Sequence, residues 1–216
     1  MIKIQKFIFN PFFVNTYIIW DEESREAAIV DPGCSNSMEE KQILEFINTK
    51  NLKLNYIINT HCHIDHIFGN SFVKEKFNSK LLMPEKDIFL LDIMKEQAES
   101  FGFSFNNHSP LPDEFISEDK SLHLGNSKGK FIFTPGHTPG EFCILFEEEK
   151  LCITGDVIFK ESIGRTDLWG GDYETLIHSI KTKILILQDD VIILPGHGED
   201  STIKHEKQFN YYLINL

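Results

Sequence analysis

The sequence has few cysteines and lacks any apolar run long enough to cross a membrane, a segment that needs about twenty residues. The first twenty residues are rich in apolar side chains, but Asn10, Pro11 and Asn15 interrupt them and no small-residue cleavage pattern follows. The four cysteines lie far apart and form no CxxC pair, which is typical of a reducing compartment. We therefore expect a cytoplasmic protein without a membrane partner.

Positive charge is also scarce. There are 21 Lys and Arg residues against 33 Asp and Glu, which gives a formal net charge of −12, and the basic residues are scattered along the chain. A protein of this charge repels nucleic-acid backbones unless a local basic patch overrides the repulsion. We expect no nucleic-acid partner, whereas a small anionic substrate remains compatible with the sequence.

The length and the hydrophobic content predict one compact domain. A chain of 216 residues with 41% hydrophobic residues can bury one sizeable core, so we expect a single domain over residues 1–216. Residues 101–119 lack periodicity and predict a long loop, a feature that often acts as a lid.

Hydrophobic periodicity predicts strands and helices in similar order in both halves of the chain. Strands are expected at 2–9, 14–20, 26–30, 55–59, 121–124, 130–134, 142–147, 150–154 and 190–194. Helices are expected at 37–50 with Ser37 as a cap, 65–77, 85–100, 172–186 and from Thr202 onwards. This order predicts an α+β fold of two similar halves, with two sheets packed face to face and helices outside.

The stretch THCHIDH, residues 60–66, supplies metal-ligand side chains at an unusual density. It follows an apolar strand, and three further strands end in the same way, in a small or turn residue and then His137, Asp156 or His197. Loops at one edge of a rigid scaffold commonly build active sites, so we expect these four strand exits to meet. His61 and His63 are two positions apart in an extended segment and therefore point to one side.

These ligands suit two catalytic metal ions better than a structural site, because nearby thiols are few and imidazole and carboxylate leave room for water. We expect two zinc ions, with iron or manganese as alternatives. The predicted ligands are His61, His63 and His137 for one ion, Asp65, His66 and His197 for the other, and Asp156 as the bridge. With one shared hydroxide, two zinc ions and two carboxylates carry a formal charge of +1, which would attract carbonyls and anions.

The motifs THCHIDH, TPGHTPG (134–140), TGD (154–156) and PGHG (195–198) resemble the metallo-β-lactamase superfamily over nearly the whole chain. Within it, residues 155–168 and 195–207 are similar to the short hydroxyacylglutathione hydrolase-like branch. The resemblance implies a four-layer αββα sandwich, two metals held as sorted above, and hydrolysis of an acyl thioester by a metal-bound hydroxide. It also implies that Asp65 orients the nucleophile and that Arg165, with Lys160 as a second candidate, binds a substrate carboxylate.

Other functions remain open. An iron persulfide dioxygenase would use a mononuclear site at His61, His137 and Asp156, because iron suits two imidazoles and one carboxylate. A hydrolase of another ester or of a lactone, and a non-catalytic module stabilised by metal, are further alternatives.

We expect no part in metal binding for three residues near the motifs. Glu141 stands where members of the superfamily often carry His or Ser, and Tyr211 stands where the short members usually carry Pro. We expect neither to touch a ligand. The alternation of the segment turns Cys62 away from its two histidine neighbours, which predicts a buried thiol instead of a ligand.

Overall fold

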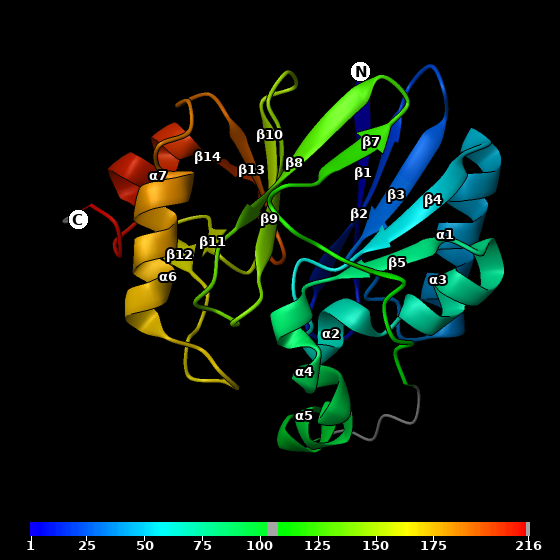
Figure 1. The fold of residues 1–216 in the computed structure, drawn as a ribbon, viewed down its shortest axis with the longest axis horizontal. Helices are drawn as coiled ribbons and strands as arrows, with labels where there is room; N and C mark the ends of the chain where they lie inside the picture. Colours follow the sequence, from blue (N-terminus) through cyan, green and yellow to red (C-terminus); the bar gives the residue numbers. More distant parts are fainter. Residues whose placement is uncertain (103–107, 215–216) are drawn as a thin grey trace. The chain divides into compact units, whose positions relative to one another are not determined.

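The computed structural model describes residues 1–102 and 108–214, and the chain divides into two compact units. Unit 1 consists of Met1–Phe115 and His123–Ser127, and unit 2 consists of Ile116–Leu122 and Lys128–Leu216. A six-stranded sheet organises unit 1, and most of a second six-stranded sheet lies in unit 2 (Figure 1).

The sheet of unit 1 has its strands in sequence order, from β1 to β6. The first three pair antiparallel, and β3 to β6 pair parallel. Parallel neighbours end at the same edge of a sheet, so the residues that follow β3 and β4 lie side by side. The strands are β1 (Ile2–Phe9), β2 (Val14–Asp21), β3 (Glu26–Val30), β4 (Lys53–Ile58), β5 (Lys80–Met83) and β6 (Glu114–Phe115).

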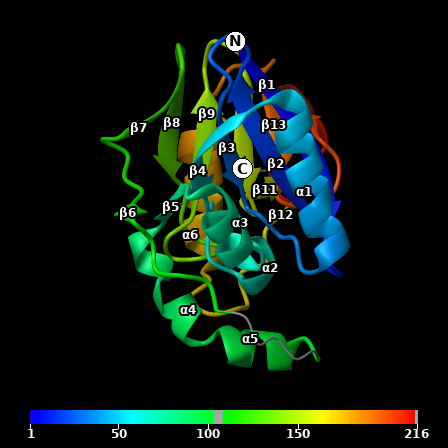
Figure 2. The same cartoon turned by 90° about the vertical axis from the view of Figure 1, so that its right-hand side faces the viewer.

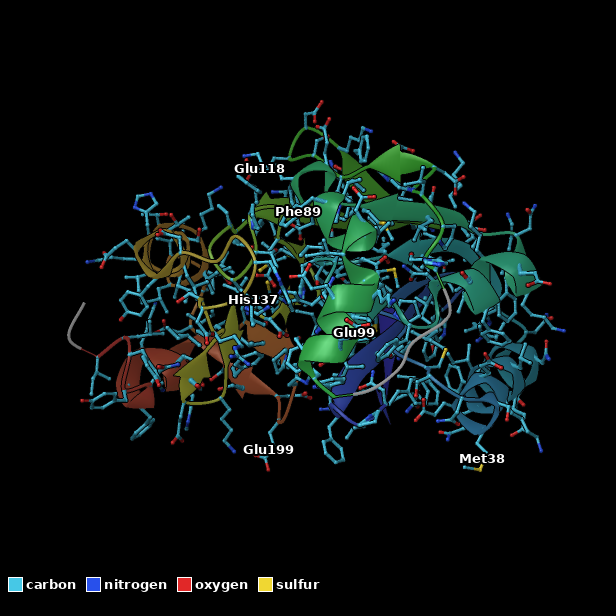
Figure 3. The ribbon with its side chains drawn as sticks, turned by 90° about the horizontal axis from the view of Figure 1, so that it is seen from below. Met38, Phe89, Glu99, Glu118, His137 and Glu199 are labelled. Atoms are coloured by element: carbon cyan, nitrogen blue, oxygen red, sulfur yellow. The ribbon has the colours of Figure 1, made fainter. Side chains whose placement is uncertain are left out.

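Helices α1 (Ser37–Lys50) and α3 (Asn70–Phe77) belong to unit 1 and lie beside its sheet (Figures 1 and 2). Phe46 of α1 packs edge-on against Phe7 and Trp20, with ring centroids 5.5 and 5.6 Å apart. The predicted cap of α1 was wrong by one residue. The side chain of Asn36, not Ser37, accepts the backbone N–H groups of the first turn. Met38 lies on the outer surface of this helix (Figure 3) and is 76% exposed.

The two other helices predicted in unit 1 are each interrupted. The segment 65–77 forms α2 (Ile64–Ile67) and α3, separated by Phe68 and Gly69. The N–H of Gly69 donates to the carbonyl of Pro32 at 2.7 Å, and a Cβ on Gly69 would lie 2.3 Å from the Cys34 sulfur. The segment 85–100 forms a short 3₁₀ turn, α4 (Phe89–Asp92) and α5 (Met94–Ser100). The break at Gly69 depends on tertiary contacts, so the periodicity of the sequence cannot reveal it.

The second sheet has the order β14-β13-β10-β9-β8-β7. Strands β10 and β13 pair parallel, so the residues after both strands lie at one edge. These strands are β7 (Ser121–Leu124), β8 (Ser127–Phe133), β9 (Phe142–Phe146), β10 (Leu151–Gly155), β13 (Ile192–Pro195) and β14 (Ser201–Thr202), and a separate hairpin is formed by β11 (Ile158–Phe159) and β12 (Ser162–Ile163).

Helices α6 (Tyr173–Ser179) and α7 (Ile203–Phe209) complete unit 2. A π-helical turn, Ile180–Ile184, continues α6. The buried core of the unit joins the strands to both helices through side chains that include Leu176, Ile193 and Ile203. Thr202 caps α7 through its hydroxyl, at the residue where the sequence predicts the last helix to begin.

Two strands of unit 1 were not predicted. Strand β5 is a four-residue buried strand, and β6 lies within the predicted loop 101–119 and pairs with β5. Residues 103–107 of that loop lie outside the described residues. Within the described part of the chain, no helix has the length and the apolar character that a membrane span requires.

Candidate metal centre

One residue, Asn59, separates the end of β4 from the THCHIDH stretch, which continues into α2. The side chains of His61 and His66 are fully buried, and His63 and Asp65 are 5% and 9% exposed as residues. The ring of His61 lies 4.9 Å from that of His63 and 4.1 Å from that of His66, centroid to centroid. Unit 1 therefore brings all four predicted ligands of this stretch together.

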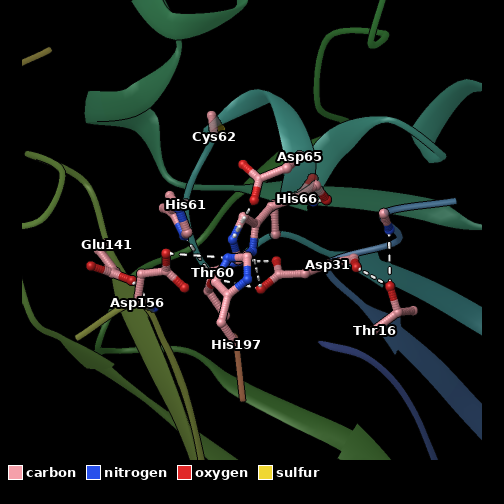
Figure 4. A network of polar contacts seen from close by, with 12 residues as sticks. Thr16, Asp31, Thr60, His61, Cys62, Asp65, His66, Glu141, Asp156 and His197 are labelled. Atoms are coloured by element: carbon pink, nitrogen blue, oxygen red, sulfur yellow. Dashed lines mark hydrogen bonds and ion pairs between the residues drawn. The ribbon is translucent and has the colours of Figure 1, made fainter. Parts of the chain in front are cut away.

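Asp31, a buried carboxylate that follows β3, lies next to this cluster (Figure 4). Its Oδ1 accepts the N–H of Thr60 at 2.8 Å, and its Oδ2 accepts the Thr60 hydroxyl at 2.6 Å and lies 3.0 Å from His66 Nδ1. Asp31 has a left-handed backbone with a φ of 49°, and its carbonyl accepts the Thr16 hydroxyl at 2.6 Å. The parallel pairing of β3 with β4 places Asp31 next to Thr60.

These hydrogen bonds orient the imidazoles. Nδ1 of His66 faces Asp31, and Nδ1 of His61 lies 3.1 Å from the Thr60 hydroxyl, so Nε2 of both rings points to the side on which a metal can bind. His66 Nε2 lies 3.6 Å from a carboxylate oxygen of Asp65. Ligand atoms of Asp31, His61 and His66 lie within 4.8 Å of one another. Because Asp31 already accepts Thr60 and faces Nδ1, we assign it to the support of the ligands.

The stretch is also held from the helical side of unit 1. The N–H of Ile64 donates to the Gln97 side chain on α5 at 3.0 Å, and the N–H of Cys62 donates to the Asp87 carboxylate at 3.3 Å. Both side chains are fully buried. Burial, and after it the nearby charges of Asp87 and Asp31, raises the pKa of the Cys62 thiol well above its usual value. Cys62 is thus a buried neutral thiol, as expected.

Unit 2 brings together His137, Asp156 and His197. His137 follows β8, and Asp156 and His197 follow the parallel strands β10 and β13. His137 Nδ1 donates to the carbonyl of Arg165 at 2.7 Å, which again points Nε2 toward a metal position. One oxygen of Asp156, Oδ2, lies 3.5 Å from His137 Nε2 and 3.6 Å from His197 Nε2.

These separations fit ligands that share a metal ion. Two donors bound to one tetrahedral zinc at about 2.0–2.2 Å are about 3.3–3.6 Å apart. The pairs Asp65–His66, His137–Asp156 and His197–Asp156 lie 3.6, 3.5 and 3.6 Å apart, beyond the range of a good hydrogen bond. The donor set of imidazole and carboxylate, with no thiolate, also suits a catalytic metal.

The expectation for Glu141 was wrong. This side chain is fully buried and accepts the backbone N–H of Asp156 at 2.7 Å, so it touches a predicted ligand residue (Figure 4). The sequence could not show this contact, because Glu141 precedes β9 and Asp156 follows β10, and only the pairing of these strands brings them together.

The guanidinium of Arg165 forms two hydrogen bonds with the carboxylate of Asp167, at 2.7 and 2.8 Å. This pair lowers the pKa of Asp167 to about 2. Both side chains are more than half exposed, so the pair adds little stability. The role of Arg165 in binding a substrate carboxylate stays a prediction. Lys160, the second candidate, forms an ion pair with Glu199.

The sequence pattern of the Metallo-beta-lactamase superfamily matches residues 9–197. The chain belongs to this superfamily. The predicted fold class is thereby confirmed, since the two sheets flanked by helices are those of the superfamily. Together with the His and Asp clusters, membership of the superfamily supports a metal-dependent hydrolase.

Relatives within the superfamily carry different activities in their names. The chain is 42% identical over 206 residues to the hydroxyacylglutathione hydrolase GloC of Haemophilus influenzae, covering 94% of each protein. It is 31% identical to the mitochondrial persulfide dioxygenase ETHE1 of Mus musculus, covering 90% of this chain and 69% of the relative. Its fold matches the crystal structure of TTHA1623 in a di-iron-bound form with a TM-score of 0.85, 27% identity, and coverage of 97% and 100%.

Sequence reasoning missed the residues that support the ligands. Neither Asp31 nor Glu141 is among the residues that the sequence predicts for the metal site. A usable signal existed for Asp31, because it directly follows a strand, as the predicted ligand Asp156 does. Gln97 gave no signal, because it lies on a helix far from any motif in the sequence.

Proposed function

We propose that the two clusters contribute to one dinuclear zinc centre, which hydrolyses a thioester such as an S-acylglutathione. His61, His63 and His137 would hold one ion, Asp65, His66 and His197 would hold the other, and Asp156 would bridge them. We also propose a cytoplasmic location, which the four free cysteines favour.

One observation carries the dinuclear proposal. The same Asp156 oxygen lies at nearly equal distances, 3.5 and 3.6 Å, from Nε2 of two histidines that are assigned to different ions. A mononuclear site at His61, His137 and Asp156 would not require Asp156 to lie within this distance of His197 as well. The similarity to GloC favours a thioester as the substrate.

When bound, two zinc ions supply Lewis acidity and lower the pKa of a water from 15.7 toward about 7. The residues of the chain do the rest. Asp65 would orient the attacking water and accept its proton, and His61, His66 and His137, fixed through Nδ1, would keep the ions in place. Water adds to the acyl carbon, the carbon–sulfur bond breaks, and the products are a carboxylic acid and a thiol.

Arg165 is the proposed contact for a substrate carboxylate. Its side chain is 53% exposed and is paired with Asp167, so a substrate would have to share the guanidinium with that carboxylate. We expect Arg165→Ala to raise KM for a carboxylate-bearing thioester and to leave KM for a neutral thioester unchanged. Equal effects on both substrates would contradict this role.

An iron persulfide dioxygenase is the second candidate, favoured by the similarity to ETHE1. It would need only His61, His137 and Asp156, a set of two imidazoles and one carboxylate. The similar distances of the Asp156 oxygen from His137 and His197, and the higher identity to GloC, favour the hydrolase.

Two variants separate these candidates. For a dinuclear hydrolase, His61→Ala and His197→Ala should each remove most thioester turnover. For a mononuclear dioxygenase, His61→Ala should abolish oxygen uptake on a persulfide, whereas His197→Ala should retain it. Metal analysis of protein purified without added metal should give nearly two zinc per chain. One iron per chain with oxygen uptake would overturn the proposal.

A further inference from the structure

Glu141 is a fully buried carboxylate whose place in the fold is at the end of the loop that carries His137. Its carbonyl accepts the N–H of Thr134 at 2.8 Å, which closes the base of that loop. Its side chain reaches the exit of β10 and accepts the N–H of Asp156 at 2.7 Å. Glu141 therefore connects the segments that carry two predicted ligands of unit 2.

The backbone at Asp156 needs an acceptor from outside the sheet. The ladder between β9 and β10 ends at the pair Ile153 and Ile144, and the register between β10 and β13 shifts before Gly155. Gly155 then takes a left-handed φ of 52°, and its carbonyl accepts the N–H of Gly196 at 2.7 Å. The N–H of Asp156 thus lies beyond the ladder, where a buried donor is costly unless it is hydrogen-bonded.

The opposite side of Asp156 is closed by another segment. A Cβ on Gly164 would lie 1.8 Å from the carbonyl oxygen of Asp156 and 3.2 Å from Cβ of His137. The next residue, Arg165, accepts the Nδ1–H of His137. Asp156 is therefore held between the close backbone of Gly164 and the hydrogen bond from Glu141, and a rotation away from either would move its carboxylate.

We infer that Glu141 is a positioning residue for the metal centre: its hydrogen bond to the Asp156 backbone keeps the bridging carboxylate in line with His137 and His197. This inference rests on the dinuclear centre of the proposed function. It assigns to Glu141 no contact with substrate or metal. What matters is that the side chain has the length and the oxygen acceptor to reach the N–H of Asp156.

Three substitutions test the length and the acceptor separately. Glu141→Gln keeps both and removes only the charge. Glu141→Asp keeps the charge but is one methylene shorter, and Glu141→Met has nearly the same length but no oxygen acceptor. If positioning is the role, Glu141→Gln should bind zinc within about threefold of the wild type. Glu141→Asp and Glu141→Met should bind it at least tenfold more weakly, as is usual for lost partners of metal ligands.

Glu206 offers a matched control in the same unit. It is also fully buried and also accepts a backbone N–H, that of Glu161 at 2.9 Å, and its carboxylate further accepts Ser201 and Asn210, which are not predicted ligands. Glu206→Met should lower the melting temperature of the metal-free protein, as Glu141→Met does, yet leave zinc affinity within threefold of the wild type. A loss of zinc affinity only at Glu141 is something that general destabilisation cannot produce.

The readout is the zinc dissociation constant of the full chain, measured by competition with a chromophoric chelator, with kcat and KM for a thioester as a second measurement. Glu141→Asp and Glu141→Met should lower kcat and leave KM nearly unchanged. Wild-type zinc affinity in both Glu141→Met and Glu141→Asp would overturn the inference. So would Glu141→Gln binding as weakly as Glu141→Met, because charge would then be the cause. If Glu141→Met fails to fold, Glu141→Asp against Glu141→Gln decides the question alone.

Failure of the proposed function would look different. A wild-type chain that binds fewer than two zinc ions, or that binds two and hydrolyses no thioester, contradicts the proposed centre or its substrate before any variant is made. Two tightly bound zinc ions in the wild type, with no change in the Glu141 variants, contradict only the inference.

Discussion

Two buried carboxylates that hold no metal in the proposed centre, Asp31 and Glu141, are hydrogen-bonded to residues that are predicted ligands. Asp31 receives three hydrogen-bonding groups from Thr60 and His66, and all of them are buried. A histidine ligand whose second nitrogen is held in this way keeps one ring orientation and one tautomer. The Asp31 network therefore fixes the direction in which His66 can bind a metal.

We expect Asp31→Ala to weaken zinc binding by about 10–100-fold, the usual effect of removing the partner of a ligand histidine. Competition with a chelator measures this. Asp21→Asn is the control, since Asp21 is also a buried carboxylate of unit 1, but it accepts Ser24 and the N-terminal ammonium. It should lower stability without weakening zinc binding. Equal zinc affinity in the wild type and Asp31→Ala would show that Asp31 does not position His66.

At the scale of elements, the break between α2 and α3 places the ligand stretch. In one continuous helix over 65–77, the N–H of Gly69 would bond within the helix and would not donate to the carbonyl of Pro32. The close approach of the backbone of Gly69 to Pro32 and Cys34 is possible because glycine has no Cβ. This contact joins the end of the ligand stretch to the turn that carries Asp31.

Gly69→Ala should therefore destabilise the protein by about 1–3 kcal/mol, the usual cost of forcing extra volume into a packed site. The new Cβ would meet the Cys34 sulfur at 2.3 Å and the Pro32 carbonyl oxygen at 2.8 Å. Moving the Pro32 backbone to relieve this clash costs stability. Denaturant unfolding of the metal-free protein measures the change.

Gly102→Ala is the comparison for this prediction. Among the described residues its Cβ would meet nothing within 4 Å, and its left-handed φ of 79° opposes the substitution. That conformation costs an alanine about 1–2 kcal/mol, but it should leave zinc affinity unchanged, whereas Gly69→Ala should also weaken zinc binding. If the metal affinity of Gly69→Ala equals that of the wild type, the junction has no part in placing the ligands.

At the scale of the whole molecule, the proposed centre takes ligands from both units. Each of the two zinc ions should then stabilise the chain as a whole by about 2.7 kcal/mol when free zinc is 100 times its dissociation constant, so both together contribute about 5.4 kcal/mol. For a chain of this size that corresponds to a shift in Tm of about 11–22 °C. We expect a chelator to lower Tm by this amount in scanning calorimetry, and to do so reversibly.

Two histidine variants make this measurement specific. His197→Ala removes a proposed ligand of unit 2 and should shrink the chelator-induced shift. His205→Ala removes a histidine that pairs with Glu161 instead, and its shift should equal that of the wild type. A full shift in His197→Ala would mean that the ligands of unit 1 bind metal alone.

The sequence by itself determined the longer strands and the order of the helices, the superfamily and the set of predicted ligands, because these depend on local periodicity and on short motifs. The ligands that follow strands could be predicted from the sequence because a strand and the residues after it are neighbours in the chain. Only the tertiary structure decided where helices break, which residues orient the histidines and what Glu141 contacts. Gly69 with Pro32, Asp31 with Thr60, and Glu141 with Asp156 are far apart in sequence. Such contacts form only when paired strands and packed helices bring distant residues together.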